Sequence, residues 1–197
     1  MKFKLFKTEV TVTFLFAATL SLMIATDRTG LILPTLFAVF IHEAGHLFAM
    51  WAADCAPKRI RLIPAAVEIT EDYGRSKGAG VWIVLCGPLA NLAVSAALFV
   101  NYYLSGAEIS LKVALLNLVL ALFNLLPVSG LDGGRLLCAA LCRKKDLYSA
   151  ERTVRLVTAA VAALIFFCGV FLIISGNANP SVLIVALYLA VCALIKR

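Results

Sequence analysis

Six long apolar segments, separated by short polar stretches, dominate the pattern of the chain. They cover residues 8–25, 31–53, 79–103, 109–126, 154–174 and 181–195. A helix needs about 20 apolar residues, within a range of about 17 to 25, to cross the hydrocarbon of a bilayer. The first five segments reach that length, and the shorter sixth segment can span where the bilayer thins. The pattern predicts an all-α polytopic membrane protein with six transmembrane helices in a single domain, residues 1–197.

Residues 58–70, with the sequence KRIRLIPAAVEIT, follow a different pattern. Basic and apolar side chains alternate from Arg59 to Leu62, and Pro64 separates this run from a second alternation around Glu68. Period-two alternation favours strands, and a central proline favours a turn between them. We expect a small membrane-associated β-hairpin between the second and third helices, with a plain surface loop as the alternative. The edge of such a hairpin could accept an extended peptide.

The composition supports a membrane protein. Of the 197 residues, 62% are hydrophobic and 15% are charged, and the mean hydropathy is +0.98. Soluble domains carry about 25% charged residues. One globular core cannot bury this excess of apolar side chains, so the bilayer is the expected solvent.

The positions of the basic residues predict the orientation in the membrane. The chain has 18 lysines and arginines against 11 acidic residues. All of these basic residues except Arg28 and Lys112 lie before the first apolar segment, in or beside the polar stretches that follow the second and fourth, or after the sixth. The positive-inside rule then places both termini in the cytoplasm. Because the charges are spread over several loops rather than gathered in one basic stripe, we expect no nucleic-acid partner.

The second apolar segment contains the sequence HEAGH, with the only two histidines of the chain. His42 and His46 are spaced i, i+4, so a helix places both imidazoles on one face, where they can share a metal ion. Glu43 can reach a water on that ion without ligating it. Imidazole nitrogens and an open coordination position suit zinc. The alternative is that these side chains only tie helices together, although ionisable groups at membrane depth are costly and usually functional.

A catalytic zinc site needs a third protein ligand. Asp132 is a candidate, since it lies in NLLPVSGLDGGRLL, residues 124–137, where the fourth apolar segment ends on the side expected to hold His46. We expect Pro127 and the glycines Gly130, Gly133 and Gly134 to break the helix, so that irregular backbone lines a polar cavity. From the residues alone, Asp-Gly-Gly is a plain turn, and a turn with no metal is the alternative.

Three motifs together resemble the site-2 protease family of intramembrane zinc metalloproteases. They are HEAGH in the second segment, GPLAN at residues 87–91, and N-x-x-P-x-x-x-x-D-G at residues 124–133. The resemblance covers the chain from about residue 31 to 137. The short six-helix plan is similar to the sporulation branch of that family, which acts on a membrane-tethered pro-sigma factor, although we expect no CBS domain after the last segment.

The resemblance implies a set of site residues. His42, His46 and Asp132 are implied as ligands of a Zn²⁺ cofactor, with Glu43 as the catalytic base. Residues implied to bind substrate or shape the site are Asn124, Pro127, Gly133, Gly87 and Asn91. Gly87 and Asn91 have helix packing as an equal alternative, because small and polar residues are common at helix contacts in membranes.

The function expected from the resemblance is an intramembrane zinc metalloendopeptidase of the bacterial cytoplasmic membrane. Its substrate would be a membrane-tethered protein, such as a transcription-factor precursor, cut in or near its transmembrane segment. Other expected partners are the lipid bilayer and inhibitory or regulatory membrane proteins. The alternative function is a metal-ion or proton transporter, since intramembrane His and Glu can relay ions. Against transport, no series of acidic residues leads to the outer face, and the chain shows no internal repeat of the kind that many transporters have.

Overall fold

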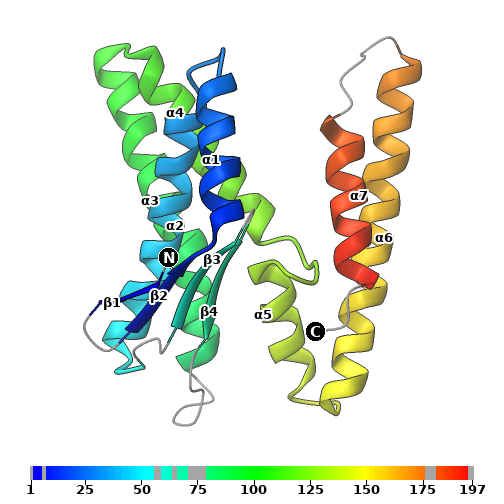
Figure 1. Cartoon of the computed structure of the whole chain (residues 1–197). Coiled ribbons are helices and arrows are strands. Elements are labelled where there is room, and N and C mark those ends of the chain that lie inside the picture. The colour runs from blue at the N-terminus through cyan, green and yellow to red at the C-terminus, as the bar shows by residue number, and fades with distance from the viewer. Residues whose placement is uncertain are drawn as a thin grey trace. The chain divides into compact units, whose positions relative to one another are not determined.

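The computed structural model describes residues 2–5, 8–55, 59–63, 66–70, 79–175 and 181–194. The described residues form four strands and seven helices, which are labelled in Figure 1. The strands are β1 (Lys2–Leu5), β2 (Thr8–Val12), β3 (Arg59–Ile63) and β4 (Ala66–Thr70). The helices are α1 (Phe14–Thr26), α2 (Ile32–Ala52), α3 (Ala79–Ser105), α4 (Glu108–Asn124), α5 (Asp132–Leu141), α6 (Leu147–Ile174) and α7 (Ser181–Leu194). The chain forms two compact units, Met1–Leu122 and Phe123–Arg197.

Three helices in the described part of the chain are long and apolar enough to cross a membrane. They are Ile32–Ala52, Gly80–Ser105 and Leu147–Ile174. The first, fourth and sixth predicted segments form the shorter helices α1, α4 and α7, of 13, 17 and 14 residues. Length and composition therefore support three of the six predicted spans, and the chain is a multi-pass membrane protein.

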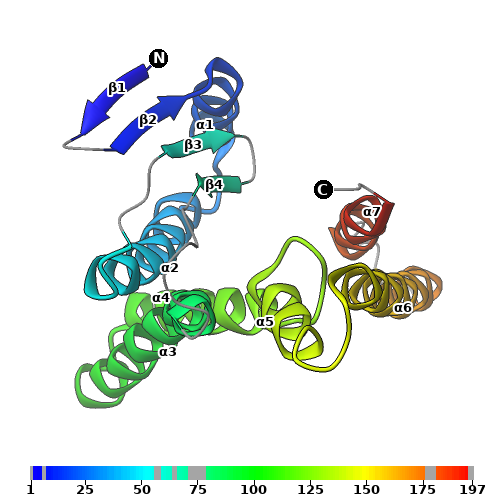
Figure 2. The same cartoon turned by 90° about the horizontal axis from the view of Figure 1, so that it is seen from below.

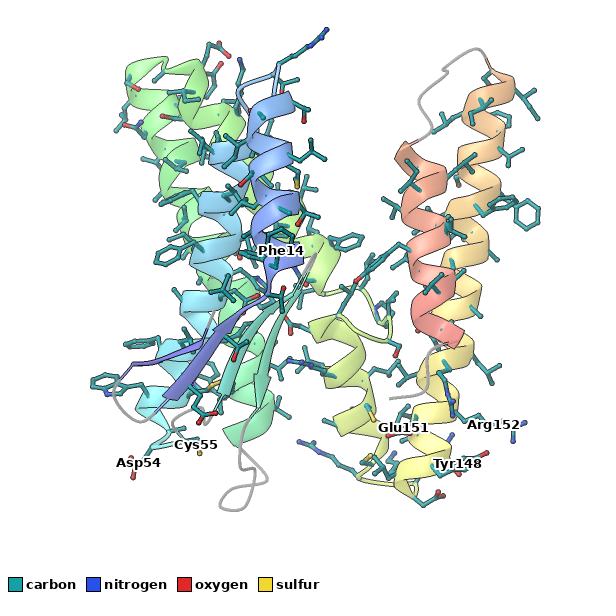
Figure 3. The ribbon with its side chains drawn as sticks, in the orientation of Figure 1. Phe14, Asp54, Cys55, Tyr148, Glu151 and Arg152 are labelled. Carbon is teal, nitrogen blue, oxygen red and sulfur yellow. The ribbon has the colours of Figure 1, made fainter. Side chains whose placement is uncertain are left out.

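The first predicted segment, residues 8–25, is not one helix. Residues 8–12, TEVTV, form strand β2, and α1 begins only at Phe14. Alternating threonine and valine favour a strand because their branched side chains are restricted in a helix. The Oγ1 of Thr13 accepts a hydrogen bond from the backbone N–H of Phe16 and caps α1. Phe14 lies where α1 meets the strands and is 87% exposed (Figure 3).

The four strands form one sheet in the order β1-β2-β3-β4 (Figure 2). Strands β3 and β4 pair antiparallel, as expected for the segment between the second and third helices, with Ile63 opposite Ala66. Pro64, the expected turn residue, lies outside the described residues. The sheet has two more strands than predicted, because β2 pairs parallel with β3 and antiparallel with β1. A two-stranded hairpin would expose one edge of β3. In this sheet, that edge is hydrogen-bonded to β2.

In the first unit, α2 packs against α3 through small side chains. A Cβ atom on Gly45 would lie 2.9 Å from the Cβ of Ala90, so the two helices approach as closely as a glycine allows. Large apolar side chains of α2 point outward instead, with Phe48 64% and Trp51 76% exposed. Small residues inside and large apolar residues outside are typical of helices packed within lipid.

Helices α3 and α4 are joined by side-chain hydrogen bonds along their length. Nδ2 of Asn91 donates to Oδ1 of Asn117 over 2.8 Å, and Oγ of Ser95 donates to the Ala114 carbonyl over 2.8 Å. Nearer the connecting turn, Nδ2 of Asn101 donates to Oγ of Ser110 over 2.7 Å. Such bonds hold helices together where apolar attraction between them is weak, because lipid is equally apolar.

In the second unit, the polypeptide after α4 is irregular over residues 125–131, as expected, but a helix that was not predicted, α5, begins at Asp132. Gly133 and Gly134 lie inside the first turn of α5 instead of breaking it. A Cβ on Gly133 would overlap the Leu125 and Leu126 carbonyl oxygens, and one on Gly134 would overlap that of Val128. These two glycines therefore allow close packing of α5 against the preceding loop.

Helix α6 begins at Leu147, seven residues before the predicted start at 154. The carboxylate of Asp146 accepts a hydrogen bond from the Ser149 N–H over 3.0 Å and caps the helix. The Ser149 hydrogen bonds hold the pKa of Asp146 below its usual value. Since the added first turns are polar, hydropathy alone placed the start of the helix too late. Helices α6 and α7 lie side by side in both views, and Gly169 lets them approach near Leu183.

Replacing Gly45 with valine should destabilise the packing of α2 on α3. The added side chain must displace Ala90 or the Cys86 carbonyl, at a cost of about 1–3 kcal/mol, the usual range for overpacking. We expect a lower melting temperature in detergent than for the control Ala52→Val, which adds the same branches at an exposed position of α2. Equal melting temperatures for the two variants would contradict this packing.

Candidate metal site

His42 and His46 lie one turn apart on α2 and are 5% and 6% exposed. Their Nε2 atoms are 3.2 Å apart, and their rings are nearly perpendicular, at 85°. Both predicted imidazoles therefore present the same ring nitrogen toward one point, inside a helix that is long and apolar enough to span a bilayer.

The other nitrogen of each ring is held by the neighbouring helix. Nδ1 of His46 lies 2.8 Å from the carbonyl oxygen of Ile83 on α3, which can only accept, so this nitrogen carries a proton. Nδ1 of His42 lies 2.9 Å from Oδ1 of Asn91. Nδ2 of Asn91 donates to the Ala38 carbonyl over 2.9 Å, which fixes the amide orientation and makes Nδ1 of His42 a donor as well.

These hydrogen bonds determine what the two Nε2 atoms can do. A neutral imidazole that carries its proton on Nδ1 has a lone pair on Nε2. Two lone pairs that face each other at 3.2 Å repel each other unless a positive charge lies between them. Ligating histidines commonly donate their second ring N–H to a carbonyl or carboxylate, which fixes the tautomer and the ring orientation. The donor set on α2 thus fits a metal ion that prefers imidazole, such as zinc.

Gly87 on α3 lies against the ring of His46. A Cβ atom on Gly87 would overlap the His46 imidazole at Nε2 and Cε1. Gly87 therefore leaves the space that the ring of a candidate ligand occupies. From the sequence, helix packing and shaping of the site were equal alternatives for this residue. Pro88 follows within α3, which continues through it without a break from Ala79 to Ser105.

Glu43 follows His42 on α2 and is partly buried. Its place in the sequence next to a candidate ligand suits a carboxylate that transfers protons at a metal-bound water. The structure thus places three predicted residues of the site, His42, Glu43 and His46, on a single helical turn and a half.

Asp132 belongs to the second unit, where it is the first residue of α5 and is 5% exposed. A carboxylate in the first turn of a helix is favoured by the helix dipole. Oδ1 of Asp132 lies 3.9 Å from Nη1 of Arg135, one turn later on α5. His42, His46 and Asp132 are all buried, and each offers an atom that can ligate a metal ion.

The loop that leads to Asp132 is held by α6. The backbone N–H of Ser129 donates to Oγ1 of Thr158 over 2.8 Å, and that hydroxyl donates to the Val154 carbonyl. Val128 is completely buried and packs in a cluster with Leu131. The start of α5, and with it the carboxylate, is therefore fixed inside the second unit by polar and apolar contacts.

The remaining predicted residues lie near this loop. Asn124 is the last residue of α4 and is partly buried, and Pro127 follows within the irregular segment. Three further residues that position the candidate site were not predicted from the sequence: Ile83, Asn117 and Thr158. Asn117 carried a signal, because it is an amide in the apolar run VALLNLVLAL. Ile83 acts through its backbone and left no signal in the sequence.

Comparison with known proteins supports the class of protein that the sequence motifs resemble. The profile of Peptidase family M50 matches residues 107–168. A zinc metalloprotease of Methanocaldococcus jannaschii is 26% identical over 137 residues, 67% of this chain and 40% of the relative. Stage IV sporulation protein FB of Bacillus subtilis is 28% identical over 180 residues, 85% of this chain and 59% of the relative. The chain therefore spans between two fifths and three fifths of the length of these curated relatives.

The fold is also that of a solved structure. The structure of the site-2 protease from Methanocaldococcus jannaschii covers 98% of this chain and 93% of its own, with a TM-score of 0.71 and 22% identity. The chain is thus distantly similar to site-2 proteases and, over residues 107–168, to Peptidase family M50. The resemblance inferred from HEAGH and its accompanying motifs is thereby confirmed.

Replacing Gly87 with alanine should weaken metal binding. The new methyl group overlaps the His46 ring, which must turn away and lose its hydrogen bond to Ile83. Losing an outer partner of a metal ligand typically lowers affinity by about 10–100-fold. Competition with a zinc chelator measures this loss, and Leu89→Ala, at an exposed position of the same helix, serves as the control. Unchanged zinc affinity in Gly87→Ala would contradict a ligand role for His46.

Replacing Thr158 with valine should loosen the loop before α5. The change removes the acceptor of the Ser129 N–H and should cost about 1–3 kcal/mol, the penalty for an unsatisfied buried donor. Hydrogen exchange of the Ser129 amide should become faster. Thr153→Val is the matched control, since Thr153 lies on the same helix and its hydroxyl donates only within that helix, to Ser149. Equal exchange in both variants would show that Thr158 does not hold the loop.

Proposed function

We propose that this protein is a zinc-dependent endopeptidase that cuts membrane-tethered proteins in or near their transmembrane segment. The observation that supports this most directly is the pair of Nε2 atoms on α2, 3.2 Å apart, with both Nδ1 atoms fixed by hydrogen bonds. A pair of imidazoles arranged in this way within an apolar helix suits a metal site. Similarity to Peptidase family M50 over residues 107–168 supports peptide hydrolysis as the reaction.

We assign His42, His46 and Asp132 as the ligands of the zinc ion. Two imidazoles and one carboxylate are an established ligand set for catalytic zinc, with one coordination position left open. Burial of all three side chains supports the assignment, because the carboxylate and the imidazoles need compensating charge and hydrogen bonds away from water. The zinc ion would polarise the peptide carbonyl and make a water acidic enough to act as a nucleophile near neutral pH.

Glu43 is the proposed general base and acid. Its carboxylate accepts a proton from the attacking water and then donates it to the nitrogen of the departing peptide. Its partial burial suits this exchange, because a group that transfers protons must meet both water and substrate. Asn91, which grips His42, and Gly87, which leaves room for His46, keep the two imidazoles in place during the reaction.

The substrate we propose is a helical segment that must unwind before it is cut. A transmembrane helix satisfies its backbone hydrogen bonds internally, so its peptide carbonyls are shielded. Helix-breaking residues in the substrate would reduce the cost of unwinding. Strand pairing with the sheet is a second route, since an edge strand can accept an extended peptide.

We also propose that the chain crosses the membrane six times, with the sheet on the cytoplasmic side. In the first unit, the α1–α2 and α3–α4 turns lie at one end and the strands at the other (Figure 1). Arg28 and Lys112 are near those turns, and all other basic residues fall elsewhere in the sequence. In the second unit, Arg152 lies near the start of α6, where further basic residues precede it (Figure 3). Helices α1 and α7, at about 1.5 Å per residue, need a locally thin bilayer to cross.

The variant Glu43→Gln should retain zinc and lose proteolysis. The amide keeps the size of the side chain but cannot accept the proton of the water, so we expect cleavage to fall by at least about 100-fold, the lower range for general base catalysis. Purified protein in liposomes, incubated with single-span candidate substrates, provides the assay, and zinc content is measured on the same samples. Normal cleavage by Glu43→Gln would refute the proposal. Zinc flux into the liposomes without cleavage by the wild type would favour the transporter instead.

A further inference from the structure

A polar connection runs from the middle of α4 to the imidazole of His42. Asn117 and Asn91 are both completely buried, and Nδ2 of Asn91 donates to Oδ1 of Asn117 over 2.8 Å. Oδ1 of Asn91 lies 2.9 Å from Nδ1 of His42. Three helices, α4, α3 and α2, are thus linked by two amides to one ring nitrogen of a candidate zinc ligand.

The direction of this connection is fixed at both amides by backbone carbonyls. Nδ2 of Asn117 donates to the Val113 carbonyl over 2.8 Å, so its oxygen must face Asn91. Nδ2 of Asn91 donates to the Ala38 carbonyl as well as to Asn117, so its oxygen must face His42. A carbonyl oxygen can only accept, and therefore neither amide can turn over without losing a buried hydrogen bond.

The hydrogen bonds of Asn91 to α2 are confined to the turn that carries the candidate ligand His42. Ala38 and His42 are one helical turn apart, and the amide of Asn91 bonds the backbone of the first and the side chain of the second. Asn117 supplies the second acceptor for the Asn91 NH₂ group. If that acceptor is lost, one N–H of the buried Asn91 amide lacks a partner, which favours rotation of the amide.

We propose that Asn117 is a positioning residue for the metal site: it holds the Asn91 amide in the orientation that keeps the His42 proton on Nδ1 and leaves Nε2 to the metal. Asn117 acts through Asn91 and does not itself ligate the ion. The inference rests on the proposed function in one respect, since it takes His42 to be a zinc ligand.

The two histidines of the chain make the test direct. Protein labelled with ¹⁵N-histidine contains only two labelled rings, and ring nitrogen shifts distinguish the Nδ1–H tautomer from the Nε2–H tautomer. In the zinc-free wild type, both rings should be Nδ1–H. In Asn117→Leu, the His42 ring should shift toward a mixture of tautomers, while His46, whose Nδ1 bonds Ile83 and not Asn91, should keep its signals. Zinc affinity should fall by about 10-fold or more.

Two further variants separate positioning from packing. Asn117→Asp retains an oxygen that can accept from Asn91, so it should keep the wild-type His42 signals and an affinity close to that of the wild type. Asn117→Ala removes the acceptor without inserting a branched apolar group, and it gives the same test if the leucine variant does not fold. Ser95→Ala is the matched control, because Ser95 forms another buried hydrogen bond between α3 and α4 that does not lead to His42.

The outcomes are distinct. Unchanged His42 signals in the leucine and alanine variants would overturn the proposal, as would equal changes in both histidine rings or the same change in Ser95→Ala. Loss of the His42 tautomer in Asn117→Asp would overturn the role of the accepting oxygen. All of these measurements are made without substrate. A protein that shows the expected signals but cleaves nothing would therefore refute the protease proposal and leave the role of Asn117 standing.

Discussion

The hydrogen bond between Nδ1 of His42 and the buried amide of Asn91 joins the chemistry of this protein to its fold. A polar group inside an apolar helix bundle must find a partner within the protein, because lipid offers none. Meeting that requirement at His42 fixes the ring, its tautomer and the direction of Nε2. It also draws α2 and α3 together, which small residues such as Gly45 and Gly87 permit. The same contacts therefore serve packing and the preparation of a metal site.

In the second unit, a buried polar side chain lies at the start of a helix. Asp132 is buried at the first turn of α5, and the loop before it is held by the Thr158 hydroxyl and by buried apolar contacts. Gly133 and Gly134 let this turn lie directly against the preceding backbone. In both units, glycines stand where a candidate ligand or its support needs close approach. These glycines leave local space, and Gly133 and Gly134 do not break the helix as the sequence predicted.

Much of the candidate site could be predicted from the sequence because its chemistry is local. His42, Glu43 and His46 lie within five residues, and helical periodicity alone places the two imidazoles on one face. The longest apolar runs, which became α2, α3 and α6, were equally clear. The first segment was assigned wrongly because threonine and valine are compatible with an apolar helix and with a strand, and the choice depended on pairing between β2 and β3, about 50 residues apart. The start of α6 was missed because its first turns are polar and are fixed by a cap at Asp146.

The sequence by itself indicated the solvent, the candidate metal ligands on α2 and the class of protein, since these follow from composition, short spacings and compact motifs. The tertiary structure decided which side chains hold those residues. Asn91 and Asn117 become partners only when α2, α3 and α4 lie together, and the backbone of Ile83 binds His46 only in that arrangement. Hydrogen bonds between distant segments leave no periodic signal in a single chain, because each partner is defined by its position in space. For this reason HEAGH could be read as a candidate metal site from sequence, whereas the orientation of its imidazoles could be read only from the fold.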